Sequence, residues 1–101
     1  PLPIALPKIS SNVQSVFHLF VIQVEKRQSL LNFLELSGIM AGIHYPLAIH
    51  QHPAYEGQIS TVSDMSITEG IVRKIISLPM YPELTISDAD KIVKVLMKFY
   101  Q

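Results

Sequence analysis

Three of the four histidines of the chain lie within residues 42–55, GIHYPLAIHQHPAY, together with two tyrosines and two prolines. Imidazole and phenol groups support three kinds of chemistry: metal ligation, proton transfer, and hydrogen bonding to a polar ligand. A proline-bounded loop that follows an extended segment often forms a wall of a binding site. A packed loop that uses tyrosines to fill space explains the same residue types equally well, and the residues alone leave both interpretations open.

Metal ligation is the first of these chemistries to weigh, because His44, His50 and His52 are close in sequence. Two ligands at positions i and i+2 share a face on a strand but not on a helical turn. The residues before Pro53 have no strand pattern, the chain has no cysteine, and the acids downstream stand at no recognised ligand spacing. We therefore expect no metal site in this segment.

Self-contained catalysis is also not indicated. The sequence has no G-x-S-x-G nucleophile turn, and its glycines, at 38, 42, 57 and 70, form neither a phosphate-binding loop nor a dinucleotide fingerprint. His18 lies in an apolar run, so we interpret it as a core or interface histidine rather than a ligand. The chain alone is not predicted to hold a complete active site.

Composition narrows the partners and the compartment. Eight basic residues balance eight acidic ones, which gives no electrostatic footprint for nucleic acid or for an anionic membrane. The longest apolar stretch is too short for a transmembrane helix. The absence of cysteine is compatible with a reducing compartment, and we expect a cytoplasmic location. The chain starts without methionine, which suggests a processed product or a piece of a longer protein.

The first half of the chain must position residues 42–55. Three prolines within residues 1–11 predict an extended arm or an edge strand, or a linker. Val16–Val24 is rich in β-branched and aromatic residues on both alternating faces, which predicts a central strand covered on both sides. Leucines at helical spacing after Glu25 predict a helix of about three turns that is capped by Gly38, and Ile39–His44 is predicted to be a second short strand.

The second half is predicted to be mainly helical. Residues 47–64 read as a loop with about one helical turn. Ser66 and Glu69 have capping-box spacing, and an apolar stripe then predicts a helix to about Ile76. An extended crossing, SLPMYP, follows. Ser87 and Asp90 repeat the capping-box spacing and begin a last helix, with one apolar face and one lysine-rich face.

These elements together predict one domain of the α/β class, in the two-layer α+β form, with a small sheet of about three strands and three helices. The apolar stripes of all three helices are expected to form the core.

Three segments of the sequence are familiar as blocks. HLFVIQVEKRQSLLNFL, SGIMAGIHYPLAIHQHPAY and IISLPMYPELT occur here in this order. They resemble successive blocks in the C-terminal part of the DegT/DnrJ/StrS family of sugar aminotransferases, over roughly Leu6 to Tyr100. The combination of GIHYP with SLPMYPELT is the specific part of this resemblance.

The resemblance implies the small C-terminal domain of a fold type I enzyme that uses pyridoxal phosphate. Residues 1–11 would then be an arm or linker from a missing large domain, and residues 12–101 the small domain. The parent enzyme would move an amino group from an amino acid such as glutamate to a keto-sugar nucleotide, in polysaccharide or antibiotic sugar biosynthesis. Its partners would be its own large domain, a second subunit of a homodimer and the nucleotide-sugar substrate.

The same resemblance implies roles for individual residues. His44 and Tyr45 would reach the substrate side of the active site. The lysine that binds pyridoxal phosphate belongs to the large domain of the family. We therefore expect this fragment to be inactive alone and to bind no cofactor, and none of its lysines matches the cofactor-lysine motif: Lys8, Lys26, Lys74, Lys91, Lys94 and Lys98.

A second hypothesis is a freestanding binding or dimerisation module with the same fold and no catalytic role. A continuous upstream reading frame for a large domain with a cofactor lysine would eliminate it. If the chain is a fragment, the face that packs on the large domain is left bare, and self-association is expected.

Overall fold

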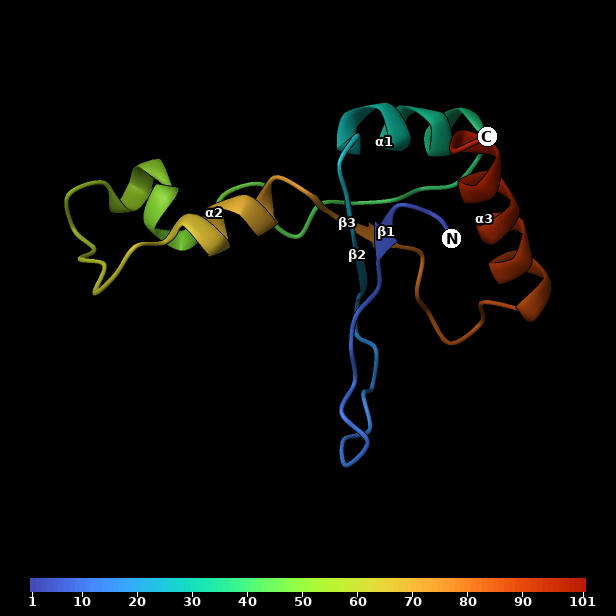
Figure 1. The fold of residues 1–101 in the computed structure, drawn as a ribbon, viewed down its shortest axis with the longest axis horizontal. Helices are drawn as coiled ribbons and strands as arrows, with labels where there is room; N and C mark the ends of the chain where they lie inside the picture. Colours follow the sequence, from blue (N-terminus) through green and yellow to red (C-terminus); the bar gives the residue numbers. More distant parts are fainter.

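The structure, a computed structural model, describes residues 1–101 and contains one open sheet of three antiparallel strands (Figure 1). Strand β1 (Ile4–Ala5) pairs with β2 (Phe20–Val24), and β2 pairs with β3 (Ile75–Leu78), in the order β1-β2-β3. With the helices α1 (Arg27–Leu36) and α3 (Ile86–Phe99) on the sheet, this confirms the two-layer α+β class. β2 is central as predicted, and residues 1–11, predicted as an extended arm, an edge strand or a linker, supply the edge strand β1.

The core lies between one face of the sheet and these two helices. Side chains alternate along a strand, so Ile22 and Val24 of β2 face the helices while Gln23 points the other way and is exposed. Ile76 stands opposite Ile22 and joins the same layer. The prediction that both faces of β2 are covered is wrong, because α1 and α3 lie on the same side of the sheet. The buried cluster consists of Ile22, Val24, Leu30, Leu34, Ile76, Ile92 and Leu96.

Helix α1 has the predicted length and the predicted end. Gly38 has a φ of 76°, which favours glycine. Its N–H donates to the carbonyl of Glu35, and the N–H of Ile39 donates to that of Leu34. This pair of bonds is a Schellman ending, and Ile39 packs against the core cluster.

Helix α3 confirms the predicted two-faced pattern, but its N-cap lies two residues earlier than the predicted one. Thr85 rather than Ser87 is the N-cap, because its Oγ1 accepts a hydrogen bond from the N–H of Asp88 at 3.1 Å. The carboxylate of Asp88 accepts from the Thr85 hydroxyl at 2.6 Å and from Lys91 at 3.1 Å. These hydrogen bonds lower the pKa of Asp88, the one from Thr85 most.

Helix α2 (Ser66–Val72) differs most from its prediction. It ends four residues early, and Ile75 and Ile76 belong to β3. Its N-cap position is Met65, and Ser66 does not cap it. Asp64 instead accepts hydrogen bonds from the N–H and hydroxyl of Ser66, which lowers its pKa. The apolar stripe of α2 is also not part of the core, since the helix has no buried residue.

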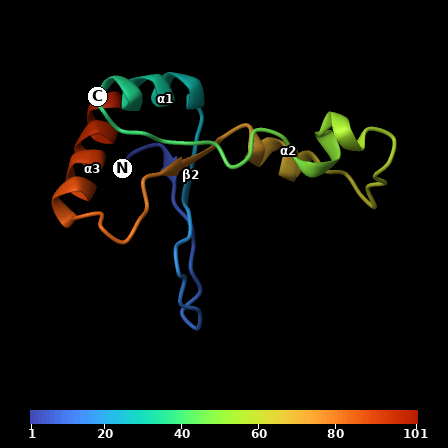
Figure 2. The ribbon, with the colours of Figure 1, turned by 180° about the vertical axis from the view of Figure 1, so that it is seen from behind.

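Two segments project from this compact part (Figures 1 and 2). Residues 6–19 form a narrow loop between β1 and β2, and His18 is exposed on it. His18 is therefore not a core histidine, whereas the alternative of an interface histidine stays a prediction. Residues 45–72, here called the arm, extend sideways and contain α2 with two short 3-10 turns, η1 (Ile49–Gln51) and η2 (Pro53–Tyr55). Ile39–His44, predicted as a strand, makes only one bridge, between Gly42 and Ser77. No helix is both long and apolar enough to cross a membrane.

Candidate functional site

His44 lies where the arm leaves the compact part, against the outer edge of β3. Its Nδ1 is 2.9 Å from the Oγ of Ser77. Ser77 pairs with Val21 and therefore points to the sheet face opposite the helices, yet it is only 5% exposed. The imidazole is thus held on one side by a buried hydroxyl, while the His44 residue as a whole is exposed.

Gly42 brings the backbone to the same point. It exchanges two backbone hydrogen bonds with Ser77, at 3.0 and 2.8 Å. A Cβ at position 42 would lie 2.9 Å from Cε1 of His44, closer than such atoms approach in proteins. The absence of a side chain at Gly42 therefore makes room for the ring of His44.

Tyr45 stands beside His44 with its ring edge-on, at 5.5 Å between ring centres. Its residue is 71% exposed, and its hydroxyl makes no hydrogen bond within the chain. The peptide bond between the two residues is cis. The structure thus brings together the two predicted site residues and leaves both a phenol and one imidazole nitrogen free for a ligand.

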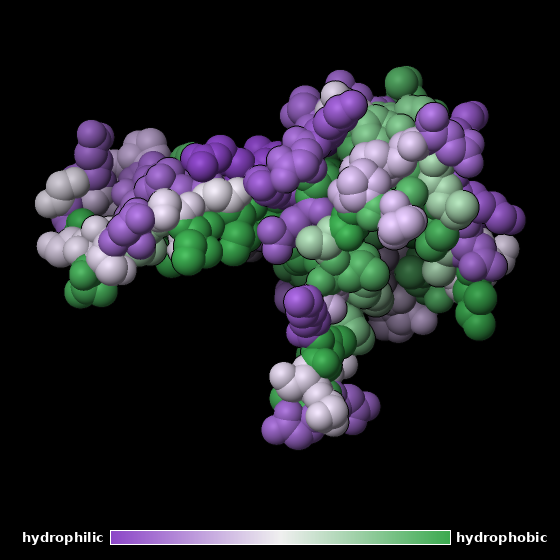
Figure 3. Space-filling view, viewed as in Figure 1, coloured by the Kyte–Doolittle hydropathy of each residue, from purple (hydrophilic) through white to green (hydrophobic).

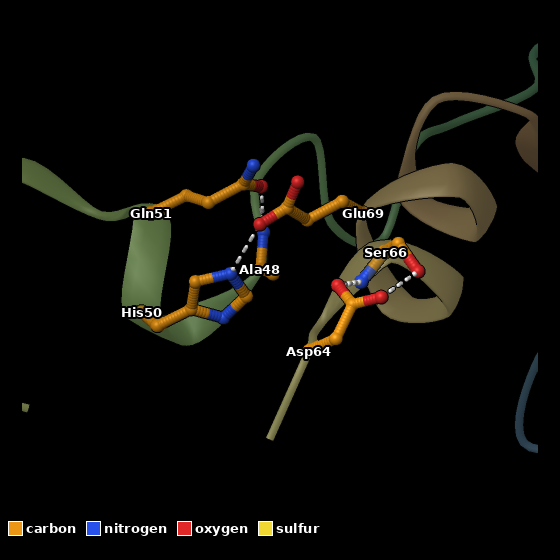
Figure 4. A network of polar contacts seen from close by, with 6 residues as sticks. All are labelled: Ala48, His50, Gln51, Asp64, Ser66 and Glu69. Carbon is orange, nitrogen blue, oxygen red and sulfur yellow. Dashed lines mark hydrogen bonds and ion pairs between the residues drawn. The ribbon is translucent and has the colours of Figure 1, made fainter. Parts of the chain in front are cut away.

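His50 serves a different purpose, inside the arm (Figure 4). Its Nε2 lies 2.9 Å from a carboxylate oxygen of Glu69, so η1 is tied to α2. Next to it, the side chain of Gln51 accepts the N–H of Ala48 at 3.2 Å, which closes the 3-10 turn. Glu69, predicted to cap its own helix, is used instead to hold the loop.

His52 completes the histidine set and also has a local role. Its Nδ1 accepts the N–H of Ala54 at 3.4 Å and starts η2. Each histidine of residues 42–55 therefore has its own partner, and the three do not meet. No group of three or more histidine, cysteine, aspartate or glutamate side chains is arranged to hold a metal ion.

A hollow of about 860 Å³ in the surface lies elsewhere. It is lined by residues 37–40, which follow α1, by the segment after β3 and by one side of α3. It contains no histidine, and its charged groups are Asp88, Lys91 and Lys94. We therefore place the candidate site at His44 and Tyr45 and not in this hollow.

Two residues of the site escaped prediction from sequence, namely Gly42 and Ser77. In the sequence, Gly42 is one of four glycines that form no phosphate-binding loop, and Ser77 is the first residue of the predicted extended crossing SLPMYP. Ser77 is 33 residues from His44 in sequence. The only signal available was a serine inside an isoleucine-rich segment, where a buried hydroxyl needs a partner.

A pyridoxal-phosphate site requires a lysine that can lose its proton in a sheltered position. Five of the six lysines are exposed, and Lys74 pairs with Glu25 at 2.7 Å. Lys91 also pairs with a carboxylate, that of Asp88. Within this chain alone, no lysine is both sheltered and unpaired.

Comparison with known proteins gives one family. The model of the DegT/DnrJ/EryC1/StrS aminotransferase family matches residues 2–97. A dTDP-3-amino-3,4,6-trideoxy-alpha-D-glucose transaminase of Streptomyces venezuelae is 32% identical over 90 residues, which are 89% of this chain and 24% of that protein. A UDP-N-acetyl-3-dehydro-alpha-D-glucosamine 3-aminotransferase of Acidithiobacillus ferrooxidans is 31% identical over 97 residues, or 96% and 26% of the two chains.

Solved structures agree with the sequence match. A DegT DnrJ EryC1 StrS aminotransferase from Brucella abortus superimposes with a TM-score of 0.90 at 28% identity, over 97% of this chain and 26% of that one. The DesV protein of S. venezuelae, solved in complex with a ketimine intermediate, gives a TM-score of 0.89 at 29% identity, over 98% and 27%. The chain thus spans about a quarter of the length of the relatives it matches.

Proposed function

The chain belongs to the DegT/DnrJ/EryC1/StrS aminotransferase family, and from this premise we propose that it is the small domain of an enzyme that aminates a keto sugar linked to a nucleotide. The observation that supports the proposal most directly is the match over nearly the whole chain to transaminases named for dTDP- and UDP-linked sugars. The amino donor is an amino acid such as glutamate.

Within this enzyme the chain's task is to hold the substrate. His44 and Tyr45 form the substrate-binding wall, and two observations support that role. The ring of His44 is anchored by Ser77, and the ring of Tyr45 packs edge-on against that of His44. Both side chains also present a hydrogen-bonding group to the outside. An imidazole and a phenol can bind the hydroxyl and phosphate oxygens of a nucleotide sugar and so restrict its orientation.

The cofactor chemistry belongs to another part of the enzyme. Pyridoxal phosphate supplies the electron sink of transamination, and a lysine outside this chain holds it. This assignment is supported by the exposure and ion pairing of the lysines present here. The rest of the enzyme, including its large domain and a second subunit, would provide the opposite side of the site.

The test uses the complete enzyme with His44→Ala and Tyr45→Phe. We expect His44→Ala to raise the KM for the nucleotide sugar by about ten- to a hundredfold, since the loss of one hydrogen bond to a charged oxygen is worth about 1.5–3 kcal/mol. Tyr45→Phe should have a smaller effect in the same direction. The half-reaction with the amino donor should keep its rate in both variants, because neither residue holds the cofactor.

His52→Ala is the matched control, because it removes an exposed histidine of the same loop that contacts only its own turn. Wild-type KM values for both His44→Ala and Tyr45→Phe would contradict the substrate-binding role. A lysine of the isolated chain that forms a specific, borohydride-trappable adduct with pyridoxal phosphate would contradict the assignment of the cofactor to another part.

A further inference from the structure

The hydroxyl of Ser77 and the ring of His44 are each other's only hydrogen-bond partner within the chain. Nδ1 of His44 lies 2.9 Å from Oγ of Ser77, and neither Oγ nor the second ring nitrogen, Nε2, makes another side-chain hydrogen bond. Ser77 is 5% exposed, whereas His44 is exposed. One side of the imidazole is therefore fixed by the protein, and the other is open.

The backbone reinforces this arrangement. Ser77 forms the bridge with Gly42, two residues before His44, through hydrogen bonds of 3.0 and 2.8 Å. The ring of His44 then fills the space over Gly42. Its Cε1 would lie only 2.9 Å from a Cβ added at position 42. A single residue of β3 thus sets both the path of the chain before His44 and the position of its ring.

The hydroxyl also determines which nitrogen carries the ring proton. A serine hydroxyl has one proton to donate and two lone pairs. If Nδ1–H donated to Oγ, the buried hydroxyl proton would have no acceptor, and an unpaired buried donor is destabilising. If the hydroxyl donates to Nδ1 instead, every buried donor is satisfied. The neutral imidazole then carries its proton on Nε2.

We propose that Ser77 is a positioning residue that holds His44 as the Nε2–H tautomer, so that the ring presents a hydrogen-bond donor to an oxygen of the substrate. The tautomer follows from the contacts within the chain, while the identity of the substrate rests on the proposed function. The acceptor is an oxygen of the nucleotide sugar, either on its diphosphate or on its sugar ring.

The first test measures the tautomer directly. Long-range 1H–15N spectra of the complete protein that contains this chain, labelled with 15N-histidine, are recorded at about pH 9, where free imidazole is neutral. His44→Gln identifies the signals of position 44. We expect the proton on Nε2 in the wild type, a mixture of tautomers in Ser77→Ala, and the wild-type pattern in Ser77→Thr, which keeps the hydroxyl. A proton on Nδ1, or an unchanged pattern in Ser77→Ala, would overturn the proposal.

The second test is a double-mutant cycle on the KM for the nucleotide sugar. Ser77→Ala should raise this KM about fivefold and leave the half-reaction with the amino donor unchanged. In the His44→Ala background, Ser77→Ala should change the KM for the nucleotide sugar by no more than about twofold. An equal rise in both backgrounds would mean that Ser77 acts on the fold or on the substrate directly, and would overturn its role through His44.

Inhibition by the free nucleoside diphosphate locates the acceptor. If Ser77→Ala weakens this inhibition as much as it raises the KM, His44 binds the diphosphate; if inhibition is unchanged, His44 binds the sugar. Failure of the proposed function has a different signature. His44→Ala would then leave the KM unchanged, while Ser77→Ala would still alter the tautomer of His44.

Discussion

At the scale of single residues, a methyl group at position 42 should be enough to displace His44. Gly42 has no positive φ, so alanine suits its backbone, and the three atoms nearest to the added Cβ all belong to the ring of His44, the first at 2.9 Å. We expect Gly42→Ala to push the ring off Ser77 and to raise the KM for the nucleotide sugar as Ser77→Ala does. In the His44→Ala background, where the ring is absent, the same substitution should be silent.

Gly70→Ala is the matched control for this prediction, because a Cβ there meets nothing within 4 Å. It lies inside α2, where alanine stabilises a helix by about 1 kcal/mol relative to glycine. Its KM should equal that of the wild type. If Gly42→Ala also kept the wild-type KM, the close fit of the ring over position 42 would have no role in binding.

The residues of the site differ in how far sequence could predict them. His44 and Tyr45 are conspicuous by type and by their place in a block that resembles a family. Ser77 is an ordinary serine, and its partner lies 33 residues away. Only the antiparallel bridge with Gly42 brings the two together, and a contact set by tertiary structure has no local pattern.

At the scale of elements, the cap of α3 gives a prediction about stability. Thr85 caps the helix, and its hydroxyl also donates to Asp88. Thr85→Ala should lower the free energy of unfolding by about 1 kcal/mol, the usual value of an N-cap. Chemical denaturation measures this change. Ser87→Ala is the control, because Ser87 lies two residues after Thr85 and makes no cap hydrogen bond.

The same cap should make stability depend on pH. The pKa of Asp88 is lowered from its ordinary value of 3.8 in the folded state. Its contribution is therefore present above about pH 4 and is lost as the pH falls through the lowered pKa. Thr85→Ala should weaken this dependence, since Thr85 is the largest cause of the shift. An identical acid profile in the variant would show that the hydrogen bond does not act on Asp88.

The boundary between α2 and β3 shows what an apolar pattern cannot decide. Ile67, Ile71 and Ile75 fit a helix, but Ile75 to Leu78 also fit a strand, because adjacent β-branched residues can serve both faces of a sheet. Pairing of Ile76 with Ile22 in β2 decides for the strand. Helices α1 and α3 had no such competitor, and their predicted apolar faces are confirmed.

At the scale of the whole molecule, the chain is far from spherical. Its radius of gyration is 15.7 Å, whereas a compact domain of this length would have about 13 Å. Only 10 of the 101 residues are buried, and seven of them form the cluster between the sheet and α1 with α3. The difference lies in the loop 6–19 and in the arm, which pack on little of the rest of the chain (Figure 1).

Apolar side chains gather on one side of the arm (Figure 3). Ile67 and Ile71 of α2 are 77% and 39% exposed, and Leu47 and Ile49 nearby are exposed as well. Burial of one such side chain is worth about 2 kcal/mol, and exposed apolar patches are typical of protein interfaces. In the isolated chain no other part of an enzyme is present to cover this patch, so a second copy of the chain is the surface available to bury it.

We therefore expect the isolated chain to self-associate through the arm. Sedimentation velocity at increasing concentration should show dimers or larger species, and Ile67→Ser with Ile71→Ser should shift them toward the monomer. Leu36→Ser is the control, because it removes an equally exposed side chain from α1, at 88% exposure, outside the arm. If both variants dissociated alike, association would reflect total apolar exposure and not this face. A wild-type chain that stays monomeric at high concentration would contradict the prediction, because the arm would then be stable with its apolar side in water.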